Sequence, residues 1–469
     1  MSVRTNVIWY AIPGLLERGA ALLLLPVYVR VLTQAELGTA MVVLALEGLG
    51  GLVIAPGIEN VYLRWARQHR EDAAGRSRDL GTIAMVHLLL LALGLGMLIA
   101  FAKPLAALLM PGIPAWPYYY LIMATVGLSS LAAPLRAEWR AQHQAGKVAG
   151  LQMIQAGVLV MSTLAALLGA RWGALSIPAG HFAAVLALLP LYAATMVRML
   201  AAGWDRQALK RVLPLASIGL PRSVYGYLFF GLGRILLHRF NGPEEVAIYA
   251  AGYQIGAVVL MAAISLNKEW QPLVLSFAGL HVPERAVLQQ LWTKSFSLFL
   301  VFGCAVALFA QPLVHGIAGS RYAASAAVVP WVVLIGVLWV PFSFLFALSL
   351  TLGRARDLAI ETFLSGAIFV GANFILIPRY GALGAAWAGV LATASGCLFL
   401  FSRSWNLFQV SRPLIGWASI FGAAMLFSGL MGGAVISWVV GALILGMLGY
   451  EAVRYWRFLG MLRPIGADA

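Results

Sequence analysis

The stretch Pro378-Arg379-Tyr380-Gly381-Ala382-Leu383-Gly384-Ala385-Ala386-Trp387-Ala388-Gly389 forms a glycine-containing turn between two long apolar runs. The same order of arginine, aromatic residue, glycine, alanine and leucine occurs earlier, at an offset of 208, in Arg171-Trp172-Gly173-Ala174-Leu175. At the same offset, Ala102-Lys103-Pro104-Leu105 recurs as Ala310-Gln311-Pro312-Leu313. Self-similarity in a single register indicates a duplicated unit.

A further pair of charged residues supports the duplication, because Arg30 with Glu36 recurs as Arg239 with Glu245 at an offset of 209. Each unit contains six apolar spans. An even number of spans returns the chain to its starting side, so the two units are predicted to be parallel repeats about an axis along the membrane normal. This arrangement is typical of transporters that bind their substrate between two halves.

The composition predicts an all-α polytopic membrane protein. Of the 469 residues, 62% are hydrophobic and 10% are charged, and the mean hydropathy is +0.88. Apolar runs of about 20 residues, the length that an α-helix needs to cross a bilayer, recur from end to end. The alternating pattern of an outer-membrane β-barrel does not occur in the sequence. We expect about 14 spans, near residues 6–30, 36–62, 80–102, 117–138, 148–170, 174–198, 212–238, 246–268, 290–313, 327–350, 358–378, 382–402, 412–430 and 434–454.

The net charge of +15 is explained by topology. With the N-terminus in the cytoplasm, cytoplasmic segments hold 23 lysines and arginines and the opposite side holds 6. This is the bias of the positive-inside rule, so we expect both termini in the cytoplasm and contacts with anionic lipids, and we exclude nucleic acid as a partner.

The repeat predicts that the chain is divided into three segments. We predict an N-lobe at 1–205 with helices 1–6, a C-lobe at 206–410 with helices 7–12, and an appended two-helix hairpin with a basic tail at 411–469. The longest internal loop is expected at about 267–292, where an amphipathic helix on the inner surface stays open.

The sequence contains no pattern that predicts a catalytic, metal or cofactor site. Both cysteines lie inside apolar spans, where a thiol behaves as a small hydrophobic group. No nucleophile has a base at usable spacing, and no phosphate-binding glycine loop or metal-ligand cluster occurs. The first apolar run contains Pro13, Glu17 and Arg18, which is too polar for a cleavable signal peptide.

Charged residues inside spans are the candidate functional residues. A charge at the bilayer centre costs about 2.5 to 3.5 kcal/mol on insertion scales, so each one requires an explanation. Glu17, Arg18, Glu47 and Arg222 lie well inside spans, and Arg234 lies nearer the outer end of the seventh span.

Two explanations stay open at this point. Arg18 and Glu47 could form a structural pair between neighbouring helices. Alternatively, Arg18, Arg222 and Arg234 could line a polar cavity and bind phosphate oxygens, since arginine is always charged and binds phosphate through two parallel hydrogen bonds. Glu47 and Glu17 are the candidates for ion coupling, because a carboxylate desolvated in the membrane can exchange protons.

The stretch Ile377 to Ala388 resembles the turn between helices 11 and 12 in polysaccharide flippases of the O-antigen type. Residues 25–32 with 36–38, residues 57–64 and residues 246–253 fit the same family, so the resemblance covers nearly the whole chain. It implies the multidrug, oligosaccharidyl-lipid and polysaccharide exporter superfamily. One departure is that Gly233 precedes Arg234, where such proteins often carry an aspartate.

The resemblance implies a flippase that moves undecaprenyl-pyrophosphate-linked oligosaccharide from the inner to the outer leaflet by alternating access through a central cationic cavity. The protein would act in lipopolysaccharide or exopolysaccharide synthesis in the bacterial inner membrane, without a cofactor and not as an enzyme. Proton or sodium coupling and contacts with other polysaccharide assembly proteins stay open. The alternatives are a cation or drug antiporter of the same superfamily and a membrane polysaccharide polymerase or ligase.

The charge bias predicts the topology. Reporter fusions after Lys147, Arg211 and Arg356 should report the cytoplasm, and fusions near Pro114, Gly242 and Ser320 should report the outer side. A fusion at Ala469 should report the cytoplasm. Two reversed locations among the first six would contradict the arrangement of 14 spans.

Overall fold

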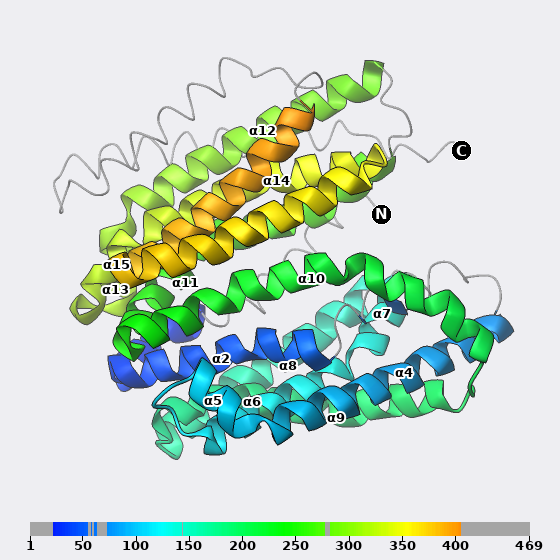
Figure 1. Cartoon of the computed structure of the whole chain (residues 1–469). Helices are drawn as coiled ribbons and strands as arrows, with labels where there is room; N and C mark the ends of the chain where they lie inside the picture. Colours follow the sequence, from blue (N-terminus) through cyan, green and yellow to red (C-terminus); the bar gives the residue numbers. More distant parts are fainter. Residues whose placement is uncertain are drawn as a thin grey trace. The chain divides into compact units, whose positions relative to one another are not determined.

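The computed structural model describes residues 22–54, 58, 61, 62, 73–142, 144–276 and 282–404 (Figure 1). Glu17, Arg18 and the predicted hairpin at 411–469 lie outside the described residues, and Arg222 is described by its backbone only. The described part is helical and contains no strand. It confirms the predicted all-α class and divides into two compact units, one formed by residues 31–247 and the other by residues 22–30 and 248–404.

The unit at 31–247 carries the longer series of elements, and its core lies where α2 packs against α4, α6, α9 and α10. The predicted lobe boundaries at 205 and 410 stay predictions, although α10 packs on α2 and α4 inside this unit. Its elements are α2 (Gln34–Ile54), α4 (Ala73–Ala100), α5 (Ala102–Leu109), α6 (Ala115–Ser130), α7 (Ala133–Ala141), α8 (Ala145–Leu164), η1 (Ala165–Gly169), η2 (Gly173–Leu175), α9 (Ser176–Leu200) and α10 (Arg206–Asn241).

The other unit begins inside α11 and has its core where α14 packs against α12 and α15. Trp270 and Trp292 contact Phe344 there, with ring centroids 5.1 and 5.4 Å apart. Its elements are α11 (Pro243–Ser276), α12 (Val282–Leu308), α13 (Ala310–Ala318), η3 (Ser320–Ala327), α14 (Val329–Thr351) and α15 (Ala355–Ser404).

Helix boundaries recur in the register that the sequence predicts. Helix α4 ends at Ala100 and α12 at Leu308, and each is followed after a single residue by a short helix, α5 or α13. Helices α2 and α11 begin at Gln34 and Pro243, which correspond to each other in the register of the repeated arginine and glutamate. The sequence pattern did not predict the breaks before α5 and α13, which divide the expected spans at 80–102 and 290–313.

The turn at Gly381 has its counterpart at Gly173. Both residues have positive φ angles, 53° and 56°, a region that an L side chain rarely adopts. Gly381 also has a ψ of −128° and divides α15 into the two expected spans. A β-carbon at Gly384 would lie 2.3 Å from the carbonyl oxygen of Leu376. The glycines of this turn are therefore required by backbone conformation and by close approach.

Nine helices of the described part are long and apolar enough to cross a membrane, one of them the kinked α15. Large apolar side chains such as Leu89, Leu93, Phe363 and Leu398 are exposed, as expected for surfaces in contact with lipid. The protein is therefore a multi-pass membrane protein.

The segment between the apolar spans that end at Asn267 and begin at Arg285 is mostly helical where it is described, because α11 continues to Ser276 and α12 begins at Val282. Trp270 and Val274 are almost completely buried in the aromatic core of this unit. Burial of these side chains stabilises helical turns beyond the apolar span that the sequence pattern marks.

Close packing through glycine generates a stability prediction. A β-carbon at Gly256 would lie 2.8 Å from the carbonyl oxygen of Val329, whereas one at Gly157 would meet no atom within 4 Å. Gly256→Ala should destabilise the protein by about 1 to 3 kcal/mol through overpacking. Gly157→Ala should be neutral or stabilising by up to about 1 kcal/mol, because alanine favours the helix.

Thermal unfolding of the two variants in one detergent measures this difference. Equal midpoints for Gly256→Ala and Gly157→Ala would contradict the close contact between α11 and α14.

Candidate functional site

Helices α2 and α10 form a close pair in the unit at 31–247. A β-carbon at Gly231 of α10 would lie 2.8 Å from the carbonyl oxygen of Ala45. The side chain of Tyr227 lies against α2, because β-carbons at Gly48 and Gly51 would be 3.7 and 3.4 Å from its ring and hydroxyl atoms. Small residues allow such close approach of helices in lipid. This contact determines which residues of α2 and α10 lie near one another.

Glu47 is on α2 near this contact, and its described partner is His181 of α9. The carboxylate Oε2 and the imidazole Nδ1 are 3.6 Å apart, and the side chains retain 37% and 29% exposure. This distance is within ion-pair range but longer than a hydrogen bond. The pair therefore links α2 to α9.

Arg234 of α10 lies on the same helix pair. It follows Tyr227 by two helical turns, so both side chains leave α10 on the side that faces α2. Arg234 is half-buried, and its Nε atom is fully buried. The two helices run antiparallel, so Arg234 and Glu47 lie on opposite sides of the contact between Gly231 and Ala45. They are separated along the helix axes by roughly one and a half helical turns.

Packing around the pair restricts the position of Glu47 and His181. Gly180, next to His181, lies so close to α8 that a β-carbon would be 1.8 Å from the Thr163 hydroxyl oxygen. On α2, a β-carbon at Gly50 would lie 3.3 Å from the Met123 side chain of α6. The backbone beside each member of the pair is therefore held by a neighbouring helix.

The predicted site residues are only partly brought together. Glu47 and Arg234 lie on one helix pair, whereas Glu17 and Arg18 are outside the described residues and the side chain of Arg222 is not described. His181 and Tyr227 are not among the candidate residues that the sequence analysis identified. Helical periodicity could not identify either as a neighbour of Glu47, because periodicity does not show which helices are adjacent.

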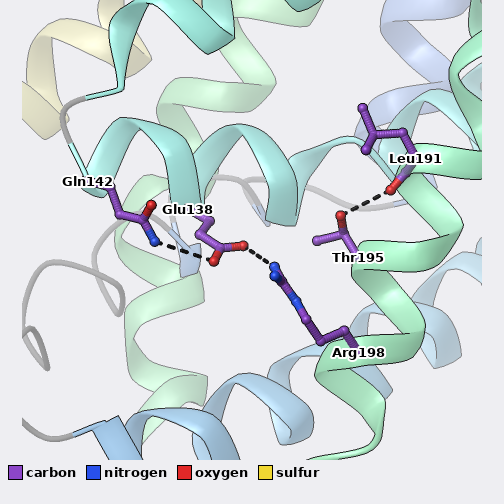
Figure 2. A network of polar contacts seen from close by, with 5 residues as sticks. All are labelled: Glu138, Gln142, Leu191, Thr195 and Arg198. Carbon is purple, nitrogen blue, oxygen red and sulfur yellow. Dashed lines mark hydrogen bonds and ion pairs between the residues drawn. The ribbon is translucent and has the colours of Figure 1, made fainter.

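A second polar network joins α7 to the end of α9 (Figure 2). Arg198 donates to the carboxylate of Glu138, which also accepts a 3.4 Å hydrogen bond from Gln142. Thr195 donates to the carbonyl oxygen of Leu191, 3.0 Å away, within α9. Since the Arg198 side chain is 64% exposed, a stabilisation of about 1 kcal/mol or less is expected. This network is structural.

Glu361 is a buried carboxylate in the other unit. It accepts hydrogen bonds from Ser365 at 3.0 Å and Thr362 at 3.2 Å, all within α15. A β-carbon at Gly396 would lie 2.8 Å from its Oε1. Glu361 is therefore enclosed by its own hairpin.

No group of three or more His, Cys, Asp or Glu side chains that could hold a metal ion occurs among the residues that the structure describes. The described helices define a multi-pass, all-α membrane protein. A family model described as "Polysaccharide biosynthesis protein" matches residues 3–273. The chain belongs to this polysaccharide biosynthesis protein family.

Comparison with solved structures supports the same fold. The lipid II flippase MurJ in an inward closed conformation gives a TM-score of 0.72 and 12% identity, covering 96% of this chain and 99% of MurJ. An inward-facing multidrug resistance transporter of the MATE family and MOP superfamily gives a TM-score of 0.61 and 15% identity. The match covers 87% of this chain and 96% of that transporter. The bent form of the Vibrio cholerae MATE transporter VcmN gives a TM-score of 0.54 and 17% identity. The match covers 87% of this chain and 99% of VcmN. No curated protein sequence matches the chain.

The contact between Glu47 and His181 leads to a prediction about Arg18. If Glu47 depended on Arg18, Arg18→Ala would leave a carboxylate unpaired in the membrane and reduce the amount of protein. Because His181 already contacts Glu47, we expect Arg18→Ala to leave membrane abundance unchanged. Quantitative immunoblotting of membranes measures this.

The double variant Arg18→Ala/Glu47→Gln provides the comparison. A loss of abundance in Arg18→Ala that the second substitution restores would show that Arg18 and Glu47 are a structural pair.

Proposed function

We propose that the protein is a flippase that moves an undecaprenyl-pyrophosphate-linked oligosaccharide from the inner to the outer leaflet by alternating access. The observation that carries the proposal is the match of residues 3–273 to the polysaccharide biosynthesis family. Similarity to the fold of the lipid II flippase MurJ over 96% of the chain supports it. The relatives are transporters and flippases, so a transport function is favoured over an enzymatic one.

The chemistry of the headgroup supports the choice of substrate. A pyrophosphate carries two or more negative charges, and these require cationic hydrogen-bond donors in a medium of low dielectric constant. In this proposal Arg18, Arg222 and Arg234 bind the headgroup, because guanidinium groups stay charged and match phosphate oxygens in pairs. Arg234 lies on the face of α10 that packs against α2, where its Nε is removed from solvent.

The cellular setting follows from the substrate. Undecaprenyl-linked sugars are assembled on the cytoplasmic face of the bacterial inner membrane, so the protein is proposed to reside there with both termini in the cytoplasm. Other polysaccharide assembly proteins are the proposed partners.

A cation or drug antiporter is the second candidate. The accessible carboxylate of Glu47 could attract a cation, and MATE transporters share the fold. The three arginines disfavour a cationic cargo. If the antiporter interpretation is correct, deletion should increase sensitivity to cationic drugs and leave surface polysaccharide unchanged.

Single substitutions of Arg18, Arg222 or Arg234 by alanine should reduce export strongly while the protein stays in the membrane. Loss of a charged hydrogen bond costs about 1.5 to 3 kcal/mol, which corresponds to a decrease of roughly 10- to 100-fold. Lysine should restore only part of the activity, because an ammonium group lacks the planar fork. Complementation of glycan export, measured beside membrane abundance, tests this.

Arg379→Ala is the matched control, since Arg379 is exposed at the turn in α15 and should tolerate the change. A leaflet-resolved assay in proteoliposomes with a defined undecaprenyl-pyrophosphate-linked sugar tests transport directly. Equal rates with and without the protein would reject the flippase, and full activity of all three alanine variants would reject the headgroup site.

A further inference from the structure

The contact between Glu47 and His181 identifies a candidate ligand site inside the membrane that the repeat pattern did not reveal. The two side chains come from α2 and α9, with Oε2 and Nδ1 3.6 Å apart. We infer that Glu47 and His181 together form a proton-binding site and that the site accepts protons rather than sodium ions. Its role in driving transport rests on the proposed flippase function, whereas proton binding itself does not.

The net charge of the Glu47–His181 pair depends on the number of protons that it holds. The pair has zero net charge when it holds one exchangeable proton. In one form the proton is on His181, which gives a carboxylate beside an imidazolium. In the other form it is on Glu47, which gives a carboxylic acid beside a neutral imidazole. Addition of a proton makes the pair cationic, and removal makes it anionic. A net charge is unfavourable within a membrane, so the proton number of the pair responds to other charges nearby. Arg234, on the same pair of helices, is such a charge.

The atoms of the pair favour a proton over a sodium ion. Hard cations are bound by several oxygen ligands, whereas the atom that the structure places opposite the Glu47 carboxylate is an imidazole nitrogen. A protonated imidazole would repel sodium. Histidine is also the side chain whose ordinary charge change falls in the physiological pH range. The donor set therefore favours the proton.

The surroundings of the Glu47 and His181 side chains combine partial exposure with close packing. The side chains of Glu47 and His181 keep 37% and 29% exposure, so the described residues do not enclose either group. Tight contacts at Gly50 and Gly180 hold the adjacent backbone against α6 and α8. The separation of 3.6 Å between Oε2 and Nδ1 is too long for a strong hydrogen bond that would trap the proton between the two groups. The described residues thus leave the pair partly exposed, beside the close packing at Gly180.

Other titratable groups with described side chains lie on the surrounding helices. His87 of α4 contacts Tyr62 and Ser130, and the Tyr119 hydroxyl of α6 donates to the Leu98 carbonyl oxygen. On α10, Tyr227 and Arg234 are on the side facing α2. The remaining groups on α4, α6, α7, α8, α9 and α10 whose side chains are described are Asp79, Tyr118, Tyr120, Arg136, Glu138, Arg140, Lys147, Tyr192, Arg198, Tyr225, His238 and Arg239.

Infrared difference spectroscopy on the purified full-length protein in lipid tests the site without any transported substrate. Acidification of the wild type should produce a carboxylic acid band and an imidazole change. Glu47→Gln should remove the carboxylic acid band, and His181→Gln should remove the imidazole change. Addition of sodium chloride at constant pH, with potassium chloride as the comparison, should leave both signals unchanged.

Glu361→Gln and His315→Gln are the matched controls. Glu361 is enclosed by α15 and His315 is exposed on α13, so neither variant should alter the two signals. Spectra of Glu47→Gln identical to the wild type would overturn the proposal. Loss of the carboxylic acid band on addition of sodium but not potassium would replace the proton by sodium.

Proteoliposomes containing undecaprenyl pyrophosphate linked to a fluorescent sugar test the role in transport. An imposed proton gradient should change the flipping rate of the wild type and of His315→Gln. The rates of Glu47→Gln and His181→Gln should no longer depend on the gradient, and a sodium gradient should have no effect on any form. Gradient dependence that persists in both variants would overturn the coupling role. Absence of flipping in the wild type would reject the proposed function, and the infrared result would still decide the proton site.

Discussion

Each backbone N–H and C=O inside a bilayer must find its hydrogen-bond partner within the protein, because hydrocarbon offers none. This constraint makes the described part of the chain helical and restricts where the helices can break. The breaks before α5 and α13 and the positive-φ glycines at 173 and 381 recur in the register of the sequence repeat. The duplicated sequence therefore encodes duplicated interruptions, and these set the lengths of the helices between them.

Helices in lipid do not associate through the hydrophobic effect, so close backbone contact at small residues contributes much of their packing. Gly231 brings α10 against α2, and Gly180 brings α9 against α8. These contacts set which of these helices lie against each other. Glu47 contacts His181 of α9 and lies on the same helix pair as Arg234. The glycine contacts thus hold helices that carry polar groups.

In the proposed function, arginines compensate the charge of an anionic lipid-linked substrate. A pyrophosphate can enter the membrane interior only if cations compensate its charge, and arginines in an empty site are themselves costly there. A neighbouring pair that can gain or lose a proton provides a way to adjust the net charge as the site fills and empties. Membership in the polysaccharide biosynthesis family and the shared fold of MurJ and MATE transporters are consistent with such a cycle, in which the substrate and the coupling ion are the parts proposed here.

The sequence by itself determined the membrane class, the positions of most spans and the register of the repeat, because apolar length and glycine turns are local properties of the chain. It also identified Glu47 and Arg234 as costly charges that need a role. The tertiary structure decided that α11 extends to Ser276, since burial of Trp270 stabilises turns that the local pattern does not mark. It also decided that His181 contacts Glu47. Helical periodicity defines the face of one helix, and only the packing of separate helices determines which faces meet.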